Sequence, residues 1–480
     1  MTTHNVFIAG EWVDTGEYRE VVDPGTGKPF EKMSVTDRAG TKKALDHAEA
    51  ARADWSGMTA MKRADILLAA ASCLERRRDE IAKTVTMENG KPYKQSNGEV
   101  SMSIDHLRWF AEEARRAYGR IVPHQADGKR HLIMKRPVGV TACISPWNFP
   151  LVLAVRKVAP ALAAGCPVIL KPASQTPACA VKFAECLEEA GIPKGVFQLV
   201  AGKASEISAE FMENPICRKI SFTGSTEVGK DLIRESAKTV TKLSLELGGH
   251  APVLVFDDAD IEKAVDGALI TKFRNTGQSC IAANRIYVQD TIYEQFVKRF
   301  AEKANELKVG YGLDENVDIG AMVNREGLDA ALAQVKNAVE SGARVVAGGE
   351  AAELGGEHSD GYYLKPTVLA DVPENAECML EETFAPVAPV ASFKTEEEAI
   401  EKANNTRYGL AAYAFTNDLN RSFRLAESLE AGTIGINDAV PSTSNCPFGG
   451  VKESGIGREL GSEGLDAFLE THHISLGGVN

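Results

Sequence analysis

The stretch SFTGSTEVGKDL, residues 221–232, combines the end of a β-strand, a glycine turn and the beginning of a helix. Gly224 and Gly229 would let backbone N–H groups approach a phosphate at the helix N-terminus, and Ser225 adds a hydroxyl donor. The glycine spacing is GxxxxG, whereas the dinucleotide fingerprint is GxGxxG. Taken alone, the stretch is therefore interpreted equally well as a plain strand-to-helix turn.

Short apolar runs surround this turn and alternate with helix-length segments. They are VIL (168–170), FQLV (197–200), KISF (219–222) and KLSLEL (242–247). This alternation predicts parallel strands joined by crossover helices, which is the doubly wound α/β layout of nucleotide-binding domains. A second alternation begins with PVLVF at 252–256 and runs through RIYVQ and RVVAGG to TIGIN at 433–437. We therefore expect a second α/β unit after a boundary near residue 250.

The first third of the chain is predicted to be rich in helices. Apolar residues recur at helical spacing at Ala64, Leu67, Ala71, Leu74 and Ile81, which indicates a packing face. The basic run 76–78 is expected to lie on this same helix, as part of a solvated face.

Composition restricts the class of protein. A length of 480 residues predicts roughly three domains. A net charge of −13 argues against nucleic-acid or membrane partners, which need a basic surface. The N-terminus does not resemble a signal peptide. The nine cysteines show no CxxC spacing, so we expect a reducing, cytoplasmic setting without disulfides or a metal site.

Cys280 ends the polar stretch NTGQSC, residues 275–280. A single cysteine is by default interpreted as a small buried hydrophobe. Here the preceding polar, glycine-containing residues predict a flexible approach and a thiol that faces a cleft. Cys280 is therefore a candidate nucleophile.

Two residues compete as the base for this thiol. His250 would give a cysteine hydrolase or acyltransferase. Glu246 lies in LELGGH near the end of an apolar strand, where burial would raise its pKa to suit a general base. Taken alone, Glu246 can equally be interpreted as a surface residue at the end of a strand.

Seven segments in the same order resemble the aldehyde dehydrogenase superfamily over nearly the whole chain. They are SPWNFP (145–150), LKPASQTP (170–177), FTGSTEVG (222–229), LELGGH (245–250), NTGQSC (275–280), EETFAPV (381–387) and PFGGVKESGIGRE (447–459). The resemblance implies that Cys280 attacks an aldehyde, that Asn148 and the Cys280 N–H hold the oxyanion, and that Glu246 activates water to hydrolyse the thioester.

The resemblance also implies a nicotinamide cofactor and the residues that bind it. These are Trp147, Lys171, Ser174, Gly224, Ser225, Gly229, Glu382 and Phe384. Many relatives carry Glu at the position of Ser174, where a carboxylate would repel a 2′-phosphate, so NADP is expected, with NAD as the alternative. Glu459 matches a proton-relay carboxylate of some members. Ala282 replaces a further cysteine of others and excludes that particular disulfide.

The implied fold is α/β, with a Rossmann-type cofactor domain, an α/β catalytic domain and a small β oligomerisation element. Residues 1–118, 138–249 and 450–466 would form the first, 250–449 the second, and 119–137 with 467–480 the third. The segment THHISLGG can be read as an extended strand whose edge would be covered by pairing between subunits. A homodimer or homotetramer is expected.

The substrate follows from two arginines and a serine. Arg156, Arg274 and Ser442 match positions that bind the substrate carboxylate in the succinate-semialdehyde dehydrogenase branch, which this chain resembles most. Succinate semialdehyde is therefore expected, with glutarate semialdehyde or another short ω-carboxy aldehyde as the alternative. A non-catalytic binding protein on this fold would be expected to lack Cys280, Glu246 or Asn148, and all three are present.

Overall fold

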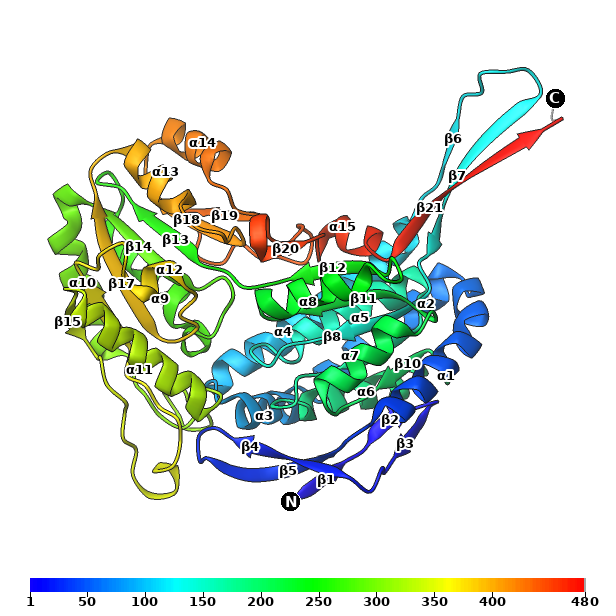
Figure 1. Cartoon of the computed structure of the whole chain (residues 1–480), viewed down its shortest axis with the longest axis horizontal. Coiled ribbons are helices and arrows are strands. Elements are labelled where there is room, and N and C mark those ends of the chain that lie inside the picture. Colours follow the sequence, from blue (N-terminus) through cyan, green and yellow to red (C-terminus); the bar gives the residue numbers. More distant parts are fainter. Residues whose placement is uncertain (479–480) are drawn as a thin grey trace.

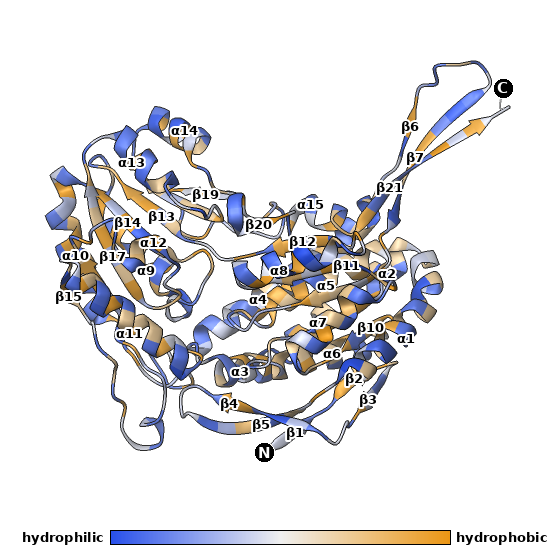
Figure 2. Cartoon of the chain, in the orientation of Figure 1, coloured by the Kyte–Doolittle hydropathy of each residue, from blue (hydrophilic) through white to orange (hydrophobic). Residues whose placement is uncertain are grey.

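The computed structural model describes residues 1–478. Two large β-sheets form the two halves of the body, and a narrow β-ribbon projects from one half (Figure 1). Apolar residues are concentrated on the central strands of both halves, and hydrophilic residues are frequent on the outer helices (Figure 2).

The first sheet has eight strands in the order β20-β12-β11-β8-β9-β10-β2-β3. Their bounds are β2 (Val6–Ile8), β3 (Glu11–Val13), β8 (Val140–Ile144), β9 (Val168–Lys171), β10 (Phe197–Leu199), β11 (Cys217–Thr223), β12 (Lys242–Glu246) and β20 (Gly455–Ile456). The five central strands are parallel, as the alternation of apolar runs predicts, and β2, β3 and β20 add antiparallel edges. The helices of this half are α1 (Arg38–Gly57), α2 (Ala60–Arg76), α3 (Arg78–Asn89), α4 (Tyr93–Glu113), α5 (Val152–Ala164), α6 (Ala178–Glu189), α7 (Ala204–Glu213), α8 (Thr226–Ser236) and α15 (Gly461–Asp466).

The second sheet has seven strands in the order β15-β16-β17-β14-β13-β18-β19. Its strands are β13 (Ala251–Val255), β14 (Ala283–Gln289), β15 (Arg344–Ala347), β16 (Thr367–Ala370), β17 (Val387–Phe393), β18 (Ala411–Phe415) and β19 (Thr433–Ile436). Its helices are α9 (Ile261–Phe273), α10 (Tyr293–Glu306), α11 (Arg325–Glu340), α12 (Glu377–Leu380), α13 (Glu396–Asn404) and α14 (Leu419–Ser428). The chain passes from the first sheet to the second between Glu246 and Ala251, so the catalytic candidates lie at the junction of the two halves (Figure 1).

Two small sheets complete the fold. β1 (Thr2–His4), β5 (Lys28–Ser34) and β4 (Tyr18–Asp23) form one of them. In the other, β21 (Leu469–Gly477) pairs along all nine residues with β7 (Lys129–Pro137), and β6 (Arg120–Val122) covers the opposite edge of β7. This second sheet is the projecting ribbon of Figure 1. The extended strand expected at THHISLGG is part of β21.

One helix expectation was wrong. The apolar positions from Ala64 to Ile81 are buried, as predicted, but they belong to two helices and not to one. Arg76 ends α2, Arg77 leaves helical geometry with φ −97° and ψ 14°, and Arg78 begins α3. The basic run therefore spans a helix break, and Arg77 forms ion pairs with Glu80 and Glu185 across it. Within residues 1–478, no helix combines the length and apolar character needed to span a bilayer.

Candidate active site

Cys280 lies in the loop between α9 and β14, and the polar residues before it are buried. Asn275 Nδ2 donates hydrogen bonds to the backbone carbonyls of Asn148 (2.7 Å) and Gln278 (2.9 Å). The Gln278 side chain accepts a hydrogen bond from the Val323 N–H (2.9 Å). The polar residues expected to form a flexible approach to the thiol are thus buried, because the amide side chains of this loop turn inward and satisfy buried backbone groups. Cys280 itself remains partly exposed.

The thiol of Cys280 is protonated in this environment. Its pKa is raised to about 12, mainly by burial, with contributions from the carboxyl groups of Glu382 and Glu246 that the nearby Arg156 charge opposes. Because the thiolate is the nucleophilic form, attack on a substrate requires a base or an added positive charge at this site.

Asn148 lies in the loop between β8 and α5, in the half of the molecule that holds the first sheet. From there it reaches the loop between α9 and β14 that carries Cys280, which we call the nucleophile loop. Its Nδ2 donates to the carbonyl oxygen of Gln278 at 3.2 Å, and its side chain is buried. An amide nitrogen carries two N–H donors, so one remains for a developing oxyanion near Cys280. The structure thus brings together two residues that are 132 positions apart in the sequence.

Glu246 is the last residue of β12 and is only 4% exposed, which excludes the surface interpretation. Its Oε2 accepts no hydrogen bond from residues 1–478. Burial raises the pKa of this carboxyl well above its usual range, and the neighbouring Glu459 carboxyl adds to the effect. A buried carboxyl with a free oxygen beside a thiol has the properties of a general base.

The Gly248-Gly249 turn after Glu246 brings this strand end close to the nucleophile. A Cβ atom on Gly249 would lie 2.0 Å from the carbonyl oxygen of Cys280, so no other residue fits. The Gly249 N–H donates to Glu382 Oε1 at 3.0 Å. Glu382 is therefore held against this turn, and burial raises its pKa to about 7.

Glu459 belongs to a buried charged cluster behind Glu246. Lys157 Nζ donates to Glu459 Oε1 and, at 2.5 Å, to Thr223 Oγ1, and Thr223 lies beside Glu246 in the register of β11 and β12. Arg156 Nε lies 3.9 Å from Glu459 Oε2. Sequence reasoning missed Lys157 and Thr223. A charged Arg-Lys pair within the otherwise apolar α5 was the available signal.

His250 does not serve Cys280. Its Nε2 is hydrogen-bonded to the Met379 carbonyl at 3.0 Å. Burial and the Arg285 charge lower its pKa to about 3. The structure therefore does not support the hydrolase interpretation, in which His250 would be the base for the thiol.

Five of the eight residues predicted to bind a dinucleotide form two groups, at the end of β9 and at the start of α8. Lys171 ends β9 as a buried cation with no ion pair among residues 1–478, and burial lowers its pKa to about 8. Ser174 follows in the next loop and is half-buried. At the other group, Ser225 caps α8 by accepting from the Val228 N–H at 3.4 Å, just after Gly224.

Gly229 has a packing role that was not predicted from the sequence. It lies on the first turn of α8, where a Cβ would lie 2.5 Å from Leu247 Cδ2, so glycine allows the helix to pack closely on the sheet. Near Cys280, the rings of Trp147 and Phe384 meet edge to face with centroids 5.3 Å apart. A buried cation without a carboxylate partner and an exposed helix N-terminus fit a phosphate-bearing cofactor.

The predicted substrate residues are brought near the site to different degrees. Arg156 packs on the Phe448 ring (4.8 Å from its centroid) and Arg274 on the Phe149 ring (5.4 Å). Burial lowers the pKa of Arg274, and the Arg156 charge contributes to this shift. Arg274 also lines an apolar cavity of about 540 Å³ together with Met102, Phe273 and Val440. Ser442 is half-buried two residues after Val440 and forms no hydrogen bond with residues 1–478.

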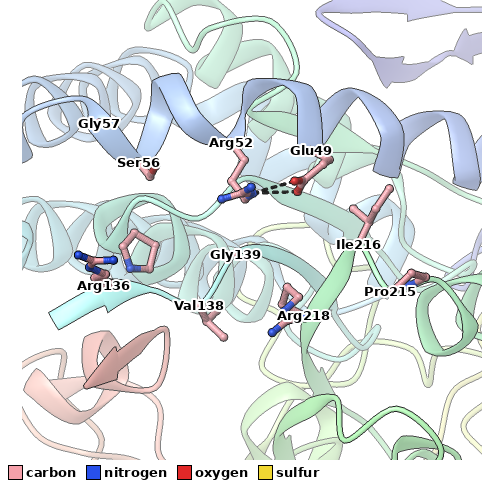
Figure 3. A pocket seen from close by; sticks show the side chains of 11 residues that line it. Glu49, Arg52, Ser56, Gly57, Arg136, Val138, Gly139, Pro215, Ile216 and Arg218 are labelled. Carbon is pink, nitrogen blue, oxygen red and sulfur yellow. Dashed lines mark hydrogen bonds and ion pairs between the residues drawn. The ribbon is translucent and has the colours of Figure 1, made fainter. Parts of the chain in front are cut away.

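A larger cavity of about 750 Å³ shares no residue with this site. Arg52, Arg136 and Arg218 line it, together with Glu49, which pairs with Arg52 (Figure 3). The three arginines are exposed and come from three elements: Arg52 from α1, Arg136 from the end of β7 and Arg218 from the start of β11.

The fold and the site define a dinucleotide-dependent class of enzyme with a cysteine nucleophile. Comparison with known proteins gives the family: residues 12–474 match the aldehyde dehydrogenase family. The chain therefore belongs to the aldehyde dehydrogenase family, as its motifs predict.

Individual relatives refine this membership. The chain is 46% identical over 473 residues to the NADP(+) succinate-semialdehyde dehydrogenase of Escherichia coli, covering 98% of this chain and 97% of the relative. It is 45% identical over 475 residues to a glutarate-semialdehyde dehydrogenase of Pseudomonas aeruginosa, covering 98% and 97%. The crystal structure of an NADP-dependent enzyme of E. coli has a TM-score of 0.97 at 44% identity, covering 99% of this chain and 98% of that one. The predicted fold class is confirmed.

Proposed function

We propose that the protein oxidises succinate semialdehyde to succinate with NADP. The observation that carries the proposal is that three separate segments meet at Cys280: Asn148 donates to the Gln278 carbonyl two residues before it, and the Glu246 carboxyl is close enough to raise the pKa of its thiol. Glutarate semialdehyde is the second candidate, because one of the similar relatives bears that name and one added methylene changes a binding pocket only modestly.

The geometry supports a two-stage reaction on Cys280. The partly exposed Cys280 thiol gives its proton to solvent water, and the thiolate sulfur attacks the aldehyde carbon. The electron pair of the C=O bond moves to oxygen, where Asn148 Nδ2 and the Cys280 N–H stabilise the negative charge. When bound, the nicotinamide dinucleotide supplies the acceptor for the hydride that leaves this carbon. The C=O bond re-forms and leaves a thioester on Cys280.

Glu246 acts in the second stage. Its carboxylate takes a proton from water, the hydroxide adds to the thioester carbon, and the thiolate of Cys280 leaves as the acid is released. Lys157 and Glu459 form a buried polar path behind Glu246, along which the proton can move away. This path supports the proposed relay role of Glu459.

NADP fits the cation at the end of β9. Lys171 would meet the adenosine ribose and its 2′-phosphate, and Ser174 adds a hydroxyl instead of a repelling carboxylate. Ser225 with Gly224 would face the pyrophosphate at the start of α8, and Glu382, Phe384 and Trp147 would enclose the nicotinamide ribose and ring. NAD is the alternative cofactor.

Arg156 and Arg274, with Ser442, would hold the distal carboxylate of the substrate. Both guanidinium groups are anchored on aromatic rings, and Arg274 has no carboxylate partner among residues 1–478. A planar guanidinium binds a carboxylate through two parallel hydrogen bonds.

Assembly and location complete the proposal. We retain the three-part domain division, which is supported by the separate hydrogen bonding of the two large sheets and the ribbon. The ribbon projects from the body, and Ile121 on β6 and Tyr118 just before it are 76% and 73% exposed, which supports a homodimer or homotetramer. All nine cysteines are free, which supports a reducing, cytoplasmic setting.

A panel assay tests the function. Formation of reduced cofactor is followed with succinate semialdehyde, glutarate semialdehyde, butanal and benzaldehyde, each with NADP and with NAD. The highest kcat/KM is expected for succinate semialdehyde with NADP. A higher value for butanal would contradict the substrate, and no reaction with any aldehyde would contradict the proposed function.

A further inference from the structure

We propose that the buried ion pair of Lys91 and Glu99 positions the side-chain amide of Asn148 for oxyanion binding. The inference rests on the proposed function, because it assumes that Asn148 stabilises the oxyanion. Neither residue of the pair lies in a segment that sequence reasoning assigned to the site. Lys91 and Glu99 are positioning residues, since they act through Asn148 and not on the substrate.

Lys91 connects the short segment between α3 and α4 to the Asn148 loop. Its side chain is fully buried, and its Nζ donates to Glu99 Oε2 at 2.6 Å and to the Asn148 carbonyl oxygen at 2.7 Å. The Nζ also lies 4.1 Å from the centroid of the Phe149 ring, the residue after Asn148. One ammonium group thus contacts two consecutive residues of the loop.

Glu99 ties the same loop at its other end. Its side chain is fully buried in α4, and its Oε1 accepts hydrogen bonds from the N–H groups of Leu151 (2.9 Å) and Val152 (3.2 Å). These N–H groups begin α5 and have no partner within that helix. The carboxylate therefore fixes the start of α5, while its second oxygen holds Lys91.

The contacts converge on one peptide group. The carbonyl oxygen of Asn148 accepts from Lys91 Nζ (2.7 Å) and Asn275 Nδ2 (2.7 Å), with Asn89 Nδ2 at 3.4 Å. Fixing a carbonyl in this way fixes the Cα of its residue, and hence the direction in which the Asn148 side chain leaves the loop. Asn275 belongs to the loop that carries Cys280, so its bond links the Asn148 carbonyl to that loop, and the Lys91 bond holds the same carbonyl in place from the other side.

A purely structural role is the competing interpretation, since buried ion pairs are costly to break from one side. The test therefore uses the double variant Lys91→Met with Glu99→Gln, which removes both charges at once. The glutamine carbonyl oxygen still accepts from Leu151 and Val152, so the start of α5 stays capped. The hydrogen bond to the Asn148 carbonyl, the contact of the ammonium group with the Phe149 ring and the charge pair are lost.

Lys219→Met is the matched control. Lys219 is also a buried lysine, 1% exposed, and its Nζ donates to Ser244 Oγ at 2.5 Å without contact to the Asn148 loop. This variant should lower thermal stability by loss of a buried hydrogen bond, but it should leave the rate of the first turnover unchanged.

The measurement is the rate of reduced-cofactor formation in the first turnover, with saturating succinate semialdehyde and NADP. The double variant should lose about 10- to 100-fold in this rate, because small misplacements of a reacting group are costly, while NADP binding is unchanged. The same substitutions made in an Asn148→Ala background should cause no further loss, because the positioned amide is already absent.

The outcomes separate the two hypotheses. If Asn148→Ala alone leaves the first turnover unaffected, the proposed function is wrong at Asn148. If Asn148→Ala is slow but the double variant matches wild type, the positioning role is wrong. If the double substitution lowers the first-turnover rate by the same factor in the Asn148→Ala background as in wild type, the pair serves general stability and the inference is wrong. An equal loss of this rate in Lys219→Met would overturn the inference in the same way.

Discussion

The side-chain amide of Asn148 and the backbone carbonyl of Gln278 are joined by a 3.2 Å hydrogen bond, two residues before Cys280. The proposed oxyanion donor therefore contacts the loop that carries the proposed nucleophile. Such an arrangement needs no reorganisation as charge develops on the aldehyde oxygen, which is the condition under which a hydrogen-bond donor is most effective in catalysis.

Asn148→Ala should therefore lower kcat by about 100- to 1000-fold, the usual effect of removing one oxyanion donor. The dissociation constant for NADP, measured by quenching of tryptophan fluorescence, should not change. A fall in cofactor affinity matching the fall in kcat would assign Asn148 to cofactor binding instead.

Cys280→Ala should abolish turnover and retain dinucleotide binding, because the thiolate forms the covalent intermediate and does not hold the cofactor. Cys446→Ala is the matched control, since Cys446 is an exposed free thiol outside the proposed site. Activity in the control and none in Cys280→Ala, over the aldehyde panel, checks the assignment. Appreciable dehydrogenase activity without Cys280 contradicts it.

Glu246→Gln should separate the two chemical stages. The glutamine cannot take a proton from water, so the first turnover should yield one equivalent of reduced cofactor and steady-state turnover should nearly stop. Rapid-mixing absorbance measures this burst. In wild type the base form is required, and the pKa of Glu246 is raised, so kcat should increase as pH rises through that pKa. A pH-independent kcat together with an unaltered Glu246→Gln enzyme would exclude this role.

Ser174→Glu should change the cofactor preference. The new carboxylate would lie near Lys171 and repel a 2′-phosphate, so KM should rise much more for NADP than for NAD. Gln175→Glu adds the same charge at the neighbouring exposed position, where solvent screens it, and is the control. If the KM ratio is unchanged in Ser174→Glu, the 2′-phosphate is bound elsewhere, with Lys203 as the next residue to test.

Arg156→Ala and Arg274→Ala should each reduce kcat/KM for succinate semialdehyde by about 10- to 100-fold, the effect of losing a charged hydrogen bond. The value for butanal, which has no carboxylate, should change little. Arg274→Lys keeps the charge but loses the planar fork and should recover only part of the activity. Equal losses for both aldehydes would show that the arginines maintain the site and do not select the substrate.

The sequence predicted the elements whose signal is local. Buried parallel strands appear in the sequence as continuous apolar runs, so β9 to β14 could be placed from these runs alone. The buried charges could not be placed, because their partners are remote: Lys157 meets Glu459 across 302 positions, and Lys91 meets Asn148 across 57. The helix break at Arg77 was missed because the apolar spacing continues through it. The inward turn of residues 275–279 depends on Asn275 and Thr276 in left-handed geometry, for which the sequence holds no clear signal.

Glu459, β20 and β21 all lie within residues 455–477, yet they contact Lys157, β12 and β7. During synthesis on the ribosome, the first sheet would therefore have one unpaired edge, and the proposed proton path would lack one carboxylate, until residues 455–477 have been synthesised. A nascent or prematurely terminated chain could bury most of its core but could not turn over substrate. The unpaired edge of β12 would make such a chain a target for chaperones and proteases.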